Sequence, residues 1–291
     1  MLLRYFFVFW YKAMQKKREQ SSQIYPTDRA TCTAGTTGFC RICGQEHVLS
    51  ALPAQKAALQ LIKTLEQVKR VDLSCPSQHA DPRCSADYLW GPARGKMFGV
   101  MVAQATQATQ ATNRETVYLK AFSGQYNGLW QIPGWVGPVF DLKKFHQVHD
   151  AKEREIKKMT VTISKLRSGA EDRQQLVRLR KKKSQQLMRK IHQLYQLQNF
   201  HRQVASLEQV FAFNMDEKGL PPTGTGDCCA PKLLQHAAVH ELTPLGLAEF
   251  YFGKENAAGT RQHGHFYPSC SGKCYPILGF MLCGLEGKQR I

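Results

Sequence analysis

Acidic side chains are scarce in this chain. Its 291 residues include 22 Asp and Glu against 40 Lys and Arg, so the formal net charge is +18. An excess of this sign favours polyanionic partners such as RNA, DNA or an anionic membrane. Charge alone does not choose among these partners, although a hydrophobic content of 43% indicates that the chain folds.

The chain also lacks a long apolar run near its start. Residues 2–11 are apolar and aromatic, but a membrane-spanning helix needs about 20 such residues. No basic segment precedes this run, and no small-residue cleavage site separates it from Lys16. We therefore expect a cytoplasmic protein with no membrane partner. Its ten cysteines are then reduced thiols, either buried or bound to a metal.

Proline is absent between Asp141 and Phe213, where apolar residues return at helical spacing. This pattern predicts two long helices that fold back at Ser168-Gly169 as an antiparallel hairpin. Between Lys143 and Arg202 we count 17 basic and 5 acidic residues, and 17 − 5 gives +12 of the total charge. Such a charge run is usually a solvated helical face. Here the shortage of acids favours RNA phosphate contact. The predicted RNA-binding residues are Arg178, Arg180, Lys181, Lys182, Lys183, Arg189 and Lys190.

The remaining patterns predict helices and strands on either side of this insert. We expect a helix over 53–71, a β-hairpin from strands 97–102 and 117–124, and a helix from 229 to 240 capped by Asp227. A strand over 245–252 and a short helix or strand over 276–285 follow. The Ala/Thr/Gln repeat at 105–112 has no apolar periodicity and predicts a solvated expansion.

Together these elements predict an α/β protein. Its core is a small mixed α/β domain, for which a deaminase-like arrangement is one option, interrupted by the long basic antiparallel helical hairpin. Four regions are expected. These are a poorly structured aromatic and Cys-containing leader (1–50), a helix plus β-hairpin (51–140), the basic helical insert (141–213) and a Cys/His-containing second half (214–291).

Cysteines and histidines gather in the last quarter of the chain. Cys228 or Cys229 can join Cys270 and Cys274, with His263 or His265, in a tetrahedral zinc site. The predicted ligand set is Cys229, Cys270, Cys274 and His265. The alternative is that these cysteines are small buried residues around a Gly/Pro turn, because cysteine is among the most buried residue types.

A second Cys/His set lies near the start of the chain. Cys32, Cys40, Cys43 and His47 offer enough ligands for a metal, but their overall spacing is not standard. The region is rich in Thr and Gly and poor in apolar residues. We therefore expect an unstructured leader with free thiols rather than a metal site. The same interpretation applies to Cys75, His79 and Cys84.

The order of hairpin, Cys-initiated helix, strand and Cys-pair loop is also that of zinc-dependent deaminases. Such sites need a Glu two residues after the first ligand, as in H-x-E followed by P-C-x-x-C. Cys229-Ala230-Pro231 offers no such Glu, and Glu249 on the predicted strand is the only nearby carboxylate candidate. These departures disfavour active deamination.

Five short segments resemble one known family. They are Gly95–Val100, Ala121–Gln125, Pro133–Asp141, Cys228–Leu234 and His263–Cys270. In this order they resemble the long N-terminal region of bacterial RluA-type pseudouridine synthases, which are associated with uridines of tRNA and large-subunit (23S) rRNA. The resemblance extends over residues 50 to 286, including the basic insert.

The resemblance implies an RNA-binding accessory region whose partners are tRNA or rRNA and a separate pseudouridine synthase catalytic domain. The family's catalytic Asp stands in an H-R-L-D-type motif that this sequence does not contain, since His201-Arg202 is followed by Gln203. We therefore expect no uridine isomerisation by this chain alone. The alternatives are a zinc-dependent deaminase-like enzyme, a structural zinc module, or a helical hairpin that binds another protein.

Overall fold

The computed structural model describes residues 35–105, 115–215 and 221–286. The aromatic run at the start of the chain, Cys32 and residues 106–112 of the repeat lie outside these ranges. Within them, no helix combines the length and the apolarity that crossing a bilayer requires.

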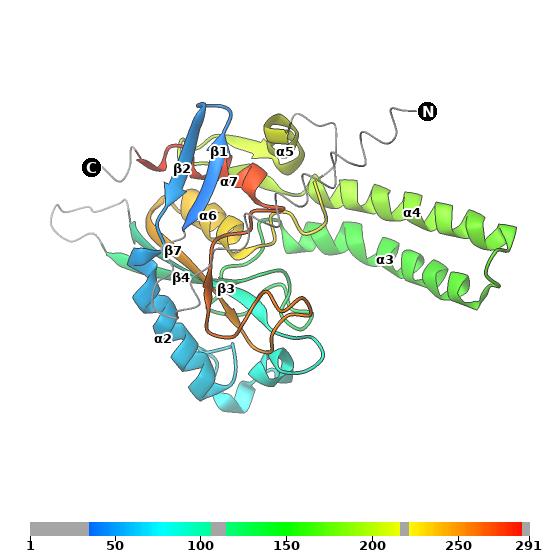
Figure 1. Ribbon diagram of the computed structural model, residues 1–291, viewed down its shortest axis with the longest axis horizontal. Coiled ribbons are helices and arrows are strands. Elements are labelled where there is room, and N and C mark those ends of the chain that lie inside the picture. The colour runs from blue at the N-terminus through cyan, green and yellow to red at the C-terminus, as the bar shows by residue number, and fades with distance from the viewer. Residues whose placement is uncertain (1–34, 106–114, 216–220, 287–291) are drawn as a thin grey trace.

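A four-stranded antiparallel sheet lies in the body of the molecule (Figure 1). Its strands, in spatial order, are β4 (Thr116–Phe122), β3 (Lys96–Ala105), β7 (Leu242–Phe252) and β8 (Phe266–Tyr267). The predicted hairpin is confirmed as the β3–β4 pair, and so is the strand at β7. With helices on both faces of this sheet, the mixed α/β class is confirmed as well.

Helices cover both faces of this sheet. Side chains alternate along β3, so Phe98 and Val100 pack with α2 (Leu52–Val68) while Met101 packs with α6 (Cys229–Val239). The sequence therefore predicted both helices correctly. Three short 3₁₀ turns, Ser77–His79, Pro82–Cys84 and Ala86–Leu89, connect α2 to β3.

Two long helices, α3 (Leu142–Lys165) and α4 (Glu171–His192), lie side by side and project from the body (Figure 1). Apolar residues from both helices, including Ile156 and Leu187, are buried in the main core cluster. Four aromatic rings pack at the base of the helix pair, with centroid separations of 4.8 to 5.4 Å. These rings belong to Trp130, Phe140, Phe145 and Tyr195.

The chain beyond α4 departs from the helical insert predicted to extend to residue 213. Helix α4 ends at His192, and β5 (Gln196–Gln198) pairs with β6 (Val204–Ser206) before α5 (Leu207–Met215). The Asn199 side-chain oxygen accepts the backbone N–H groups of His201 and Gln203 at 3.0 and 2.9 Å. Asn favours turns because its side chain bonds nearby backbone. That turn chemistry overrides the helical spacing of the leucines.

The predicted poorly structured leader is wrong for residues 36–49. Strand β1 (Thr36–Cys40) pairs with β2 (Gln45–Leu49), and this hairpin packs against α7 (Tyr275–Leu282). Gly38 and Gly279 allow the two backbones to approach closely, because a Cβ on either would overlap backbone atoms of the other element. The hairpin is stabilised by this distant contact rather than by an apolar pattern of its own.

Replacing Gly279 by Ala should unfold the protein more easily. The added methyl group would overlap the Phe39 carbonyl, and overpacking costs about 1–3 kcal/mol. This exceeds the roughly 1 kcal/mol by which Ala favours a helix over Gly. Urea denaturation measures the difference, with Gly91→Ala as control because its new Cβ meets only ordinary contacts at 3.7 and 3.9 Å. Equal stability of the two variants would contradict the close packing.

Candidate metal centre and basic helix pair

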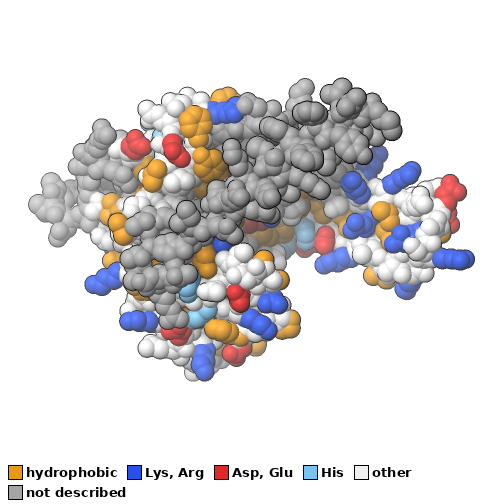
Figure 2. Space-filling model, viewed as in Figure 1, with side chains coloured by type: hydrophobic (Ala, Val, Ile, Leu, Met, Phe, Trp, Pro, Cys, Tyr) orange, Lys and Arg blue, Asp and Glu red, His pale blue; other side chains and the backbone are white. Residues whose placement is uncertain are grey.

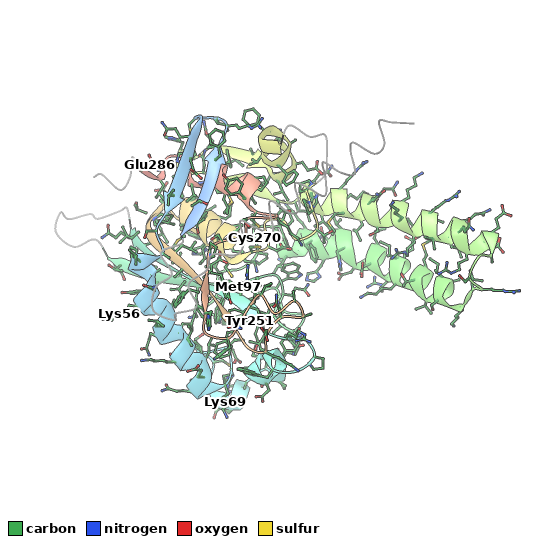
Figure 3. All side chains as sticks on the ribbon, in the orientation of Figure 1. Lys56, Lys69, Met97, Tyr251, Cys270 and Glu286 are labelled. Carbon is green, nitrogen blue, oxygen red and sulfur yellow. The ribbon has the colours of Figure 1, made fainter. Side chains whose placement is uncertain are left out.

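Three cysteine sulfurs converge where the loops before α6 and α7 meet. Cys228 is the N-cap of α6, Cys274 is the N-cap of α7, and Cys270 (Figure 3) lies in the loop after β8. The three sulfur atoms all lie within 4.8 Å of one another, so this group can hold a metal ion.

Hydrogen bonds within this group already favour a thiolate. The thiols of Cys228 and Cys274 lower the pKa of Cys270, and the Lys273 N–H donates to its sulfur at 3.4 Å. A metal would replace the remaining thiol protons on binding. Tetrahedral zinc accepts four ligands, so the three sulfurs found among the described residues leave one position for water or another group.

Cys229, predicted as a ligand, does not belong to this group. Its buried Sγ donates to the Met97 carbonyl at 3.4 Å. Cys228 has an extended backbone before the helix, with φ −70° and ψ 168°. Cys229 is the first residue of the helix and packs close to Gly99 of the sheet. Cys228 therefore takes the position predicted for Cys229.

His265, predicted as the fourth ligand, lies outside the group of three sulfurs. Its backbone is instead tied to Tyr251 and Gln262. The sequence predicts the start of this helix at residue 229, but it does not show that Cys229 packs on the sheet at Gly99 and leaves Cys228 to join the group.

Asp227 connects the three-cysteine group to the base of the helix pair. It was predicted to cap α6, but no side-chain cap is formed, and its Oδ1 accepts the Tyr195 hydroxyl at 2.7 Å. Burial raises the pKa of Asp227. Tyr195 follows α4 and packs on Phe140. The residue before Cys228 thus contacts the aromatic cluster from which α3 and α4 project.

Glu249 of β7 is buried beside the same helix start. Its Oε1 accepts the Ala230 N–H at 3.2 Å and the Ser269 hydroxyl at 2.8 Å, and the residue is only 4% exposed. The Ser269 hydroxyl also lies 2.6 Å from that of Thr36 in β1. Burial raises the pKa of Glu249 to about 7, so its carboxyl group exchanges a proton near neutral pH.

Lys232 is a second buried ionisable group, which no sequence pattern indicated. Its ammonium donates to the carbonyls of Phe122 and Gly124 at 2.9 and 2.8 Å and lies over the rings of Phe122 and Trp130. Burial lowers the pKa of Lys232 to about 8. The two carbonyls and the two rings offset the cost of burying the charge, and they fix α6 to the end of β4.

The predicted RNA-binding residues lie on α4 of the projecting helix pair. Arg178, Lys181, Lys182, Arg189 and Lys190 are exposed, and Lys and Arg side chains gather around this lobe in Figure 2. The two helices carry 15 basic and 5 acidic residues, and 15 − 5 gives +10. Arg180 and Lys183 are half-buried.

Lys183 differs from the exposed cations because it contacts Glu155 of α3 at 2.7 Å. Part of its charge is therefore already compensated within the helix pair.

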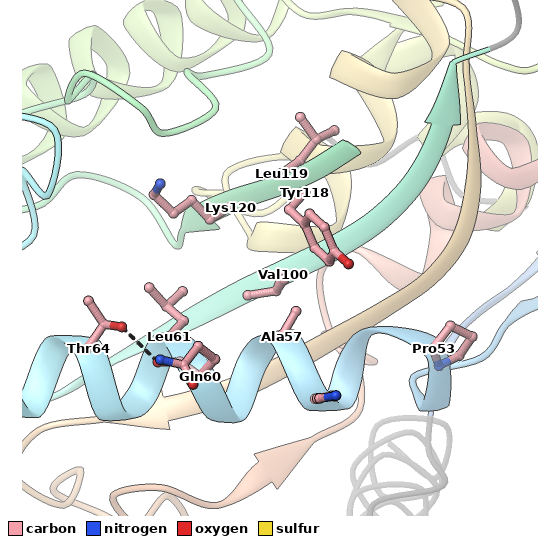
Figure 4. Close-up of a pocket in the computed structure, with 10 residues that line it drawn as sticks. Pro53, Ala57, Gln60, Leu61, Thr64, Val100, Tyr118, Leu119 and Lys120 are labelled. Carbon is pink, nitrogen blue, oxygen red and sulfur yellow. Dashed lines mark hydrogen bonds between the residues drawn. The ribbon is translucent and has the colours of Figure 1, made fainter. Parts of the chain in front are cut away.

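A groove of about 550 Å³ runs between α2 and the edge strand β4 (Figure 4). Lys56, Tyr118 and Lys120 are among its lining residues, and Tyr118 is 65% exposed. The Lys120 ammonium lies 5.5 Å from the centre of the Trp135 ring, and burial lowers its pKa. Because α2 and α6 cover opposite faces, the sheet separates this groove from α6.

No protein-family model, curated protein or solved structure matches this chain. The functions considered below therefore depend on the residues, their charges and their geometry.

Replacing Glu249 by Gln should make stability less dependent on pH. The pKa of Glu249 is raised from 4.5 to about 7, so the folded state binds this proton more tightly than the unfolded state does. The resulting stabilisation is complete below pH 4.5 and is lost as the pH rises to about 7. At about 1.4 kcal/mol per pKa unit, the loss is on the order of 3 kcal/mol.

A glutamine side chain at this position carries no titrating proton, yet its oxygen can still accept the Ala230 and Ser269 hydrogen bonds. The free energy of unfolding of Glu249→Gln, relative to that of the wild type, should therefore increase as the pH is raised from 5 to 8. Urea denaturation at each pH measures this difference. Other groups titrate in both proteins and cancel in the difference. If the stability of both proteins depends on pH in the same way, the raised pKa of the buried Glu249 is contradicted.

Proposed function

We propose that this protein is an RNA-binding accessory region for uridine-to-pseudouridine isomerisation in tRNA or rRNA. The helix pair α3–α4 forms a basic antiparallel hairpin that binds phosphates, and the α/β body holds it in place. The observation that carries this proposal is the +10 charge on two projecting helices, within a chain whose total is +18.

The length of the helices suits contact with several phosphates. Helix α3 has 24 residues, which at 1.5 Å each extends about 36 Å. Exposed cations such as Arg178 and Lys190 occur along α4, so the charge is not confined to one end. Phosphate contact of this kind releases counterions, gives salt-dependent affinity and reads little sequence.

Zinc bound by Cys228, Cys270 and Cys274 would stabilise the base of this arm. It would tie the loop before α6 to the loop before α7. Asp227, next to the first ligand, would pass that constraint to Tyr195 at the root of the helix pair. The metal is thus proposed to act on structure rather than on RNA.

The catalytic step would be supplied by a separate pseudouridine synthase domain. This part of the proposal is supported by the five short segments that resemble the N-terminal region of RluA-type synthases. The H-R-L-D-type motif does not occur in the sequence, so the purified chain should not isomerise uridine by itself.

Neutralising the exposed cations of α4 should weaken RNA binding and its salt dependence. We would change Arg178, Lys181, Lys182, Arg189 and Lys190 to Ala and measure affinity for tRNA and rRNA fragments across a salt series. The slope of log K against log salt should flatten by about 0.7–0.9 for each phosphate that the variant no longer neutralises.

The matched control removes five exposed cations from the body instead. These are Lys56, Lys63, Lys69, Arg83 and Lys254, each changed to Ala. The control should retain most of the wild-type affinity and slope. Equal losses of affinity in both variants would show that binding depends only on the net charge of the protein. If the wild type does not bind RNA at low salt, the proposal is wrong. A salt-insensitive protein partner for the helix pair would favour the protein-interaction alternative.

A zinc-dependent deaminase-like enzyme is the second candidate. The observation that favours it is the bond from the Ala230 N–H to the Glu249 carboxylate. Ala230 stands two residues after Cys228, where H-x-E deaminases have their proton-transferring Glu. Glu249 of β7 therefore brings a carboxyl group with a pKa of about 7 to that place.

This candidate requires turnover of a base. Zinc-loaded wild-type protein should release ammonia from cytidine- or adenosine-containing RNA, and Glu249→Gln should abolish the release. Ammonia is measured directly, with zinc content determined in both proteins so that metal loss is not mistaken for loss of catalysis. If the zinc-loaded wild type releases none, Glu249 is a buried structural carboxyl.

A further inference from the structure

A second group of Cys and His side chains that can hold a metal ion lies at the opposite end of α7. It contains Cys40 at the end of β1, Cys43 in the following turn, His47 in β2 and Cys283 directly after α7. One donor atom from each lies within 4.8 Å of all the others. Cys283 completes the group among the described residues, whereas Cys32, which the sequence pattern grouped with the first three, lies outside them.

The turn of the hairpin brings two of these sulfurs together. Cys40-Arg41-Ile42-Cys43-Gly44 has the C-x2-C spacing of structural zinc sites. Gly44 adopts φ +71° and donates its N–H to the Cys40 carbonyl at 2.8 Å, so the chain reverses tightly after Cys43. Strand β2 then returns alongside β1, and the Nε2 atom of His47 lies 3.1 Å from the Cys43 sulfur.

The fourth donor comes from the far end of the sequence. The Gly38–Gly279 contact places the end of β1 against α7, and Cys283 is the C-cap of that helix. Cys40, His47 and Cys283 are buried, whereas Cys43 is exposed. The four donors therefore converge from two separate elements whose backbones are in direct contact.

We propose that Cys40, Cys43, His47 and Cys283 bind one Zn²⁺ ion in a closed structural site. Zinc accepts three thiolates and one imidazole in a tetrahedron, with Zn–S bonds of about 2.3 Å and hence sulfurs roughly 3.8 Å apart. Donor atoms already within 4.8 Å need only a small contraction to reach that geometry. Ca²⁺ and Mg²⁺ prefer oxygen ligands and do not fit this set.

A carboxylate is placed to orient the histidine. The Nδ1 atom of His47 lies 3.4 Å from Oε1 of Glu286. A proton on Nδ1 directs the imidazole toward Glu286 and leaves the Nε2 lone pair facing the sulfurs. Metal-bound histidines commonly have such a carboxylate partner, which fixes the tautomer and the ring orientation. The site thus has a second layer of contacts as well as four ligands.

This zinc site is independent of the proposed RNA binding and of the Cys228–Cys270–Cys274 centre. Zinc would join the β1–β2 hairpin, which supplies Cys40, Cys43 and His47, to the end of α7, which supplies Cys283. Loss of metal binding at one site would leave the other site intact, so zinc binding at the two sites can be tested separately.

Metal content of the purified full chain tests the site. Cys43→Ser and Cys283→Ser should each bind one zinc fewer per chain than the wild type. Cys75→Ser is the matched control, because this thiol lies outside both groups and donates to the His79 carbonyl. It should keep the wild-type zinc content. Unchanged zinc in Cys43→Ser and Cys283→Ser would overturn the proposal.

A measurement on the wild type guards against misfolded variants. Zinc-loaded protein is treated with iodoacetamide before and after a chelator removes the metal, and each cysteine is located by mass spectrometry. Cys43 is the readout, because it is exposed whereas Cys40 and Cys283 are buried, and it should react only after chelation. Cys75 should react equally in both samples. Ready alkylation of Cys43 in the zinc-loaded protein would contradict its role as a ligand.

Discussion

The close packing of the first turn of α6 on β3 organises most of the molecule. Gly99 leaves room for Cys229, so the helix start lies low on the sheet. From this position the Ala230 N–H reaches Glu249 of β7, and the ammonium of Lys232 reaches the end of β4. The sheet and the three-cysteine group therefore share one anchoring point, and a side chain in place of Gly99 would disturb both.

This anchoring point is polar at its core. Glu249 and Lys232 are almost completely buried, and burying a charged group is costly unless hydrogen bonds compensate it. Both groups have such bonds. Burial lowers the pKa of Lys232 and raises that of Glu249, so it favours the neutral form of each. Partly satisfied buried networks are destabilising, whereas complete ones favour a single arrangement of the core. The orientation of α6 is thus fixed by directional contacts as well as by apolar packing.

The sequence predicts those parts of the fold that depend on local periodicity. Helix α2 and the β3–β4 hairpin follow directly from apolar spacing. The choice between Cys228 and Cys229 depends on which of them packs on the sheet, and the predicted start of the helix at residue 229 does not determine that. The grouping of Cys40 with Cys283 depends on a close backbone contact between glycines, which leaves no apolar pattern in the sequence. Local pattern therefore indicates which residues can bind a metal but not which ones meet.

The pairing of an early hairpin with a late helix has a consequence for protein synthesis. The β1–β2 hairpin emerges from the ribosome long before α7, and 239 residues separate His47 from Glu286. At about 5–20 residues per second, the hairpin waits roughly 10 to 50 seconds for its partner. During that interval Gly38 has no helix to pack against, and Cys40 and Cys43 are open to chaperones, oxidants or competing metals. The order of translation thus makes this junction one of the last parts of the fold to close.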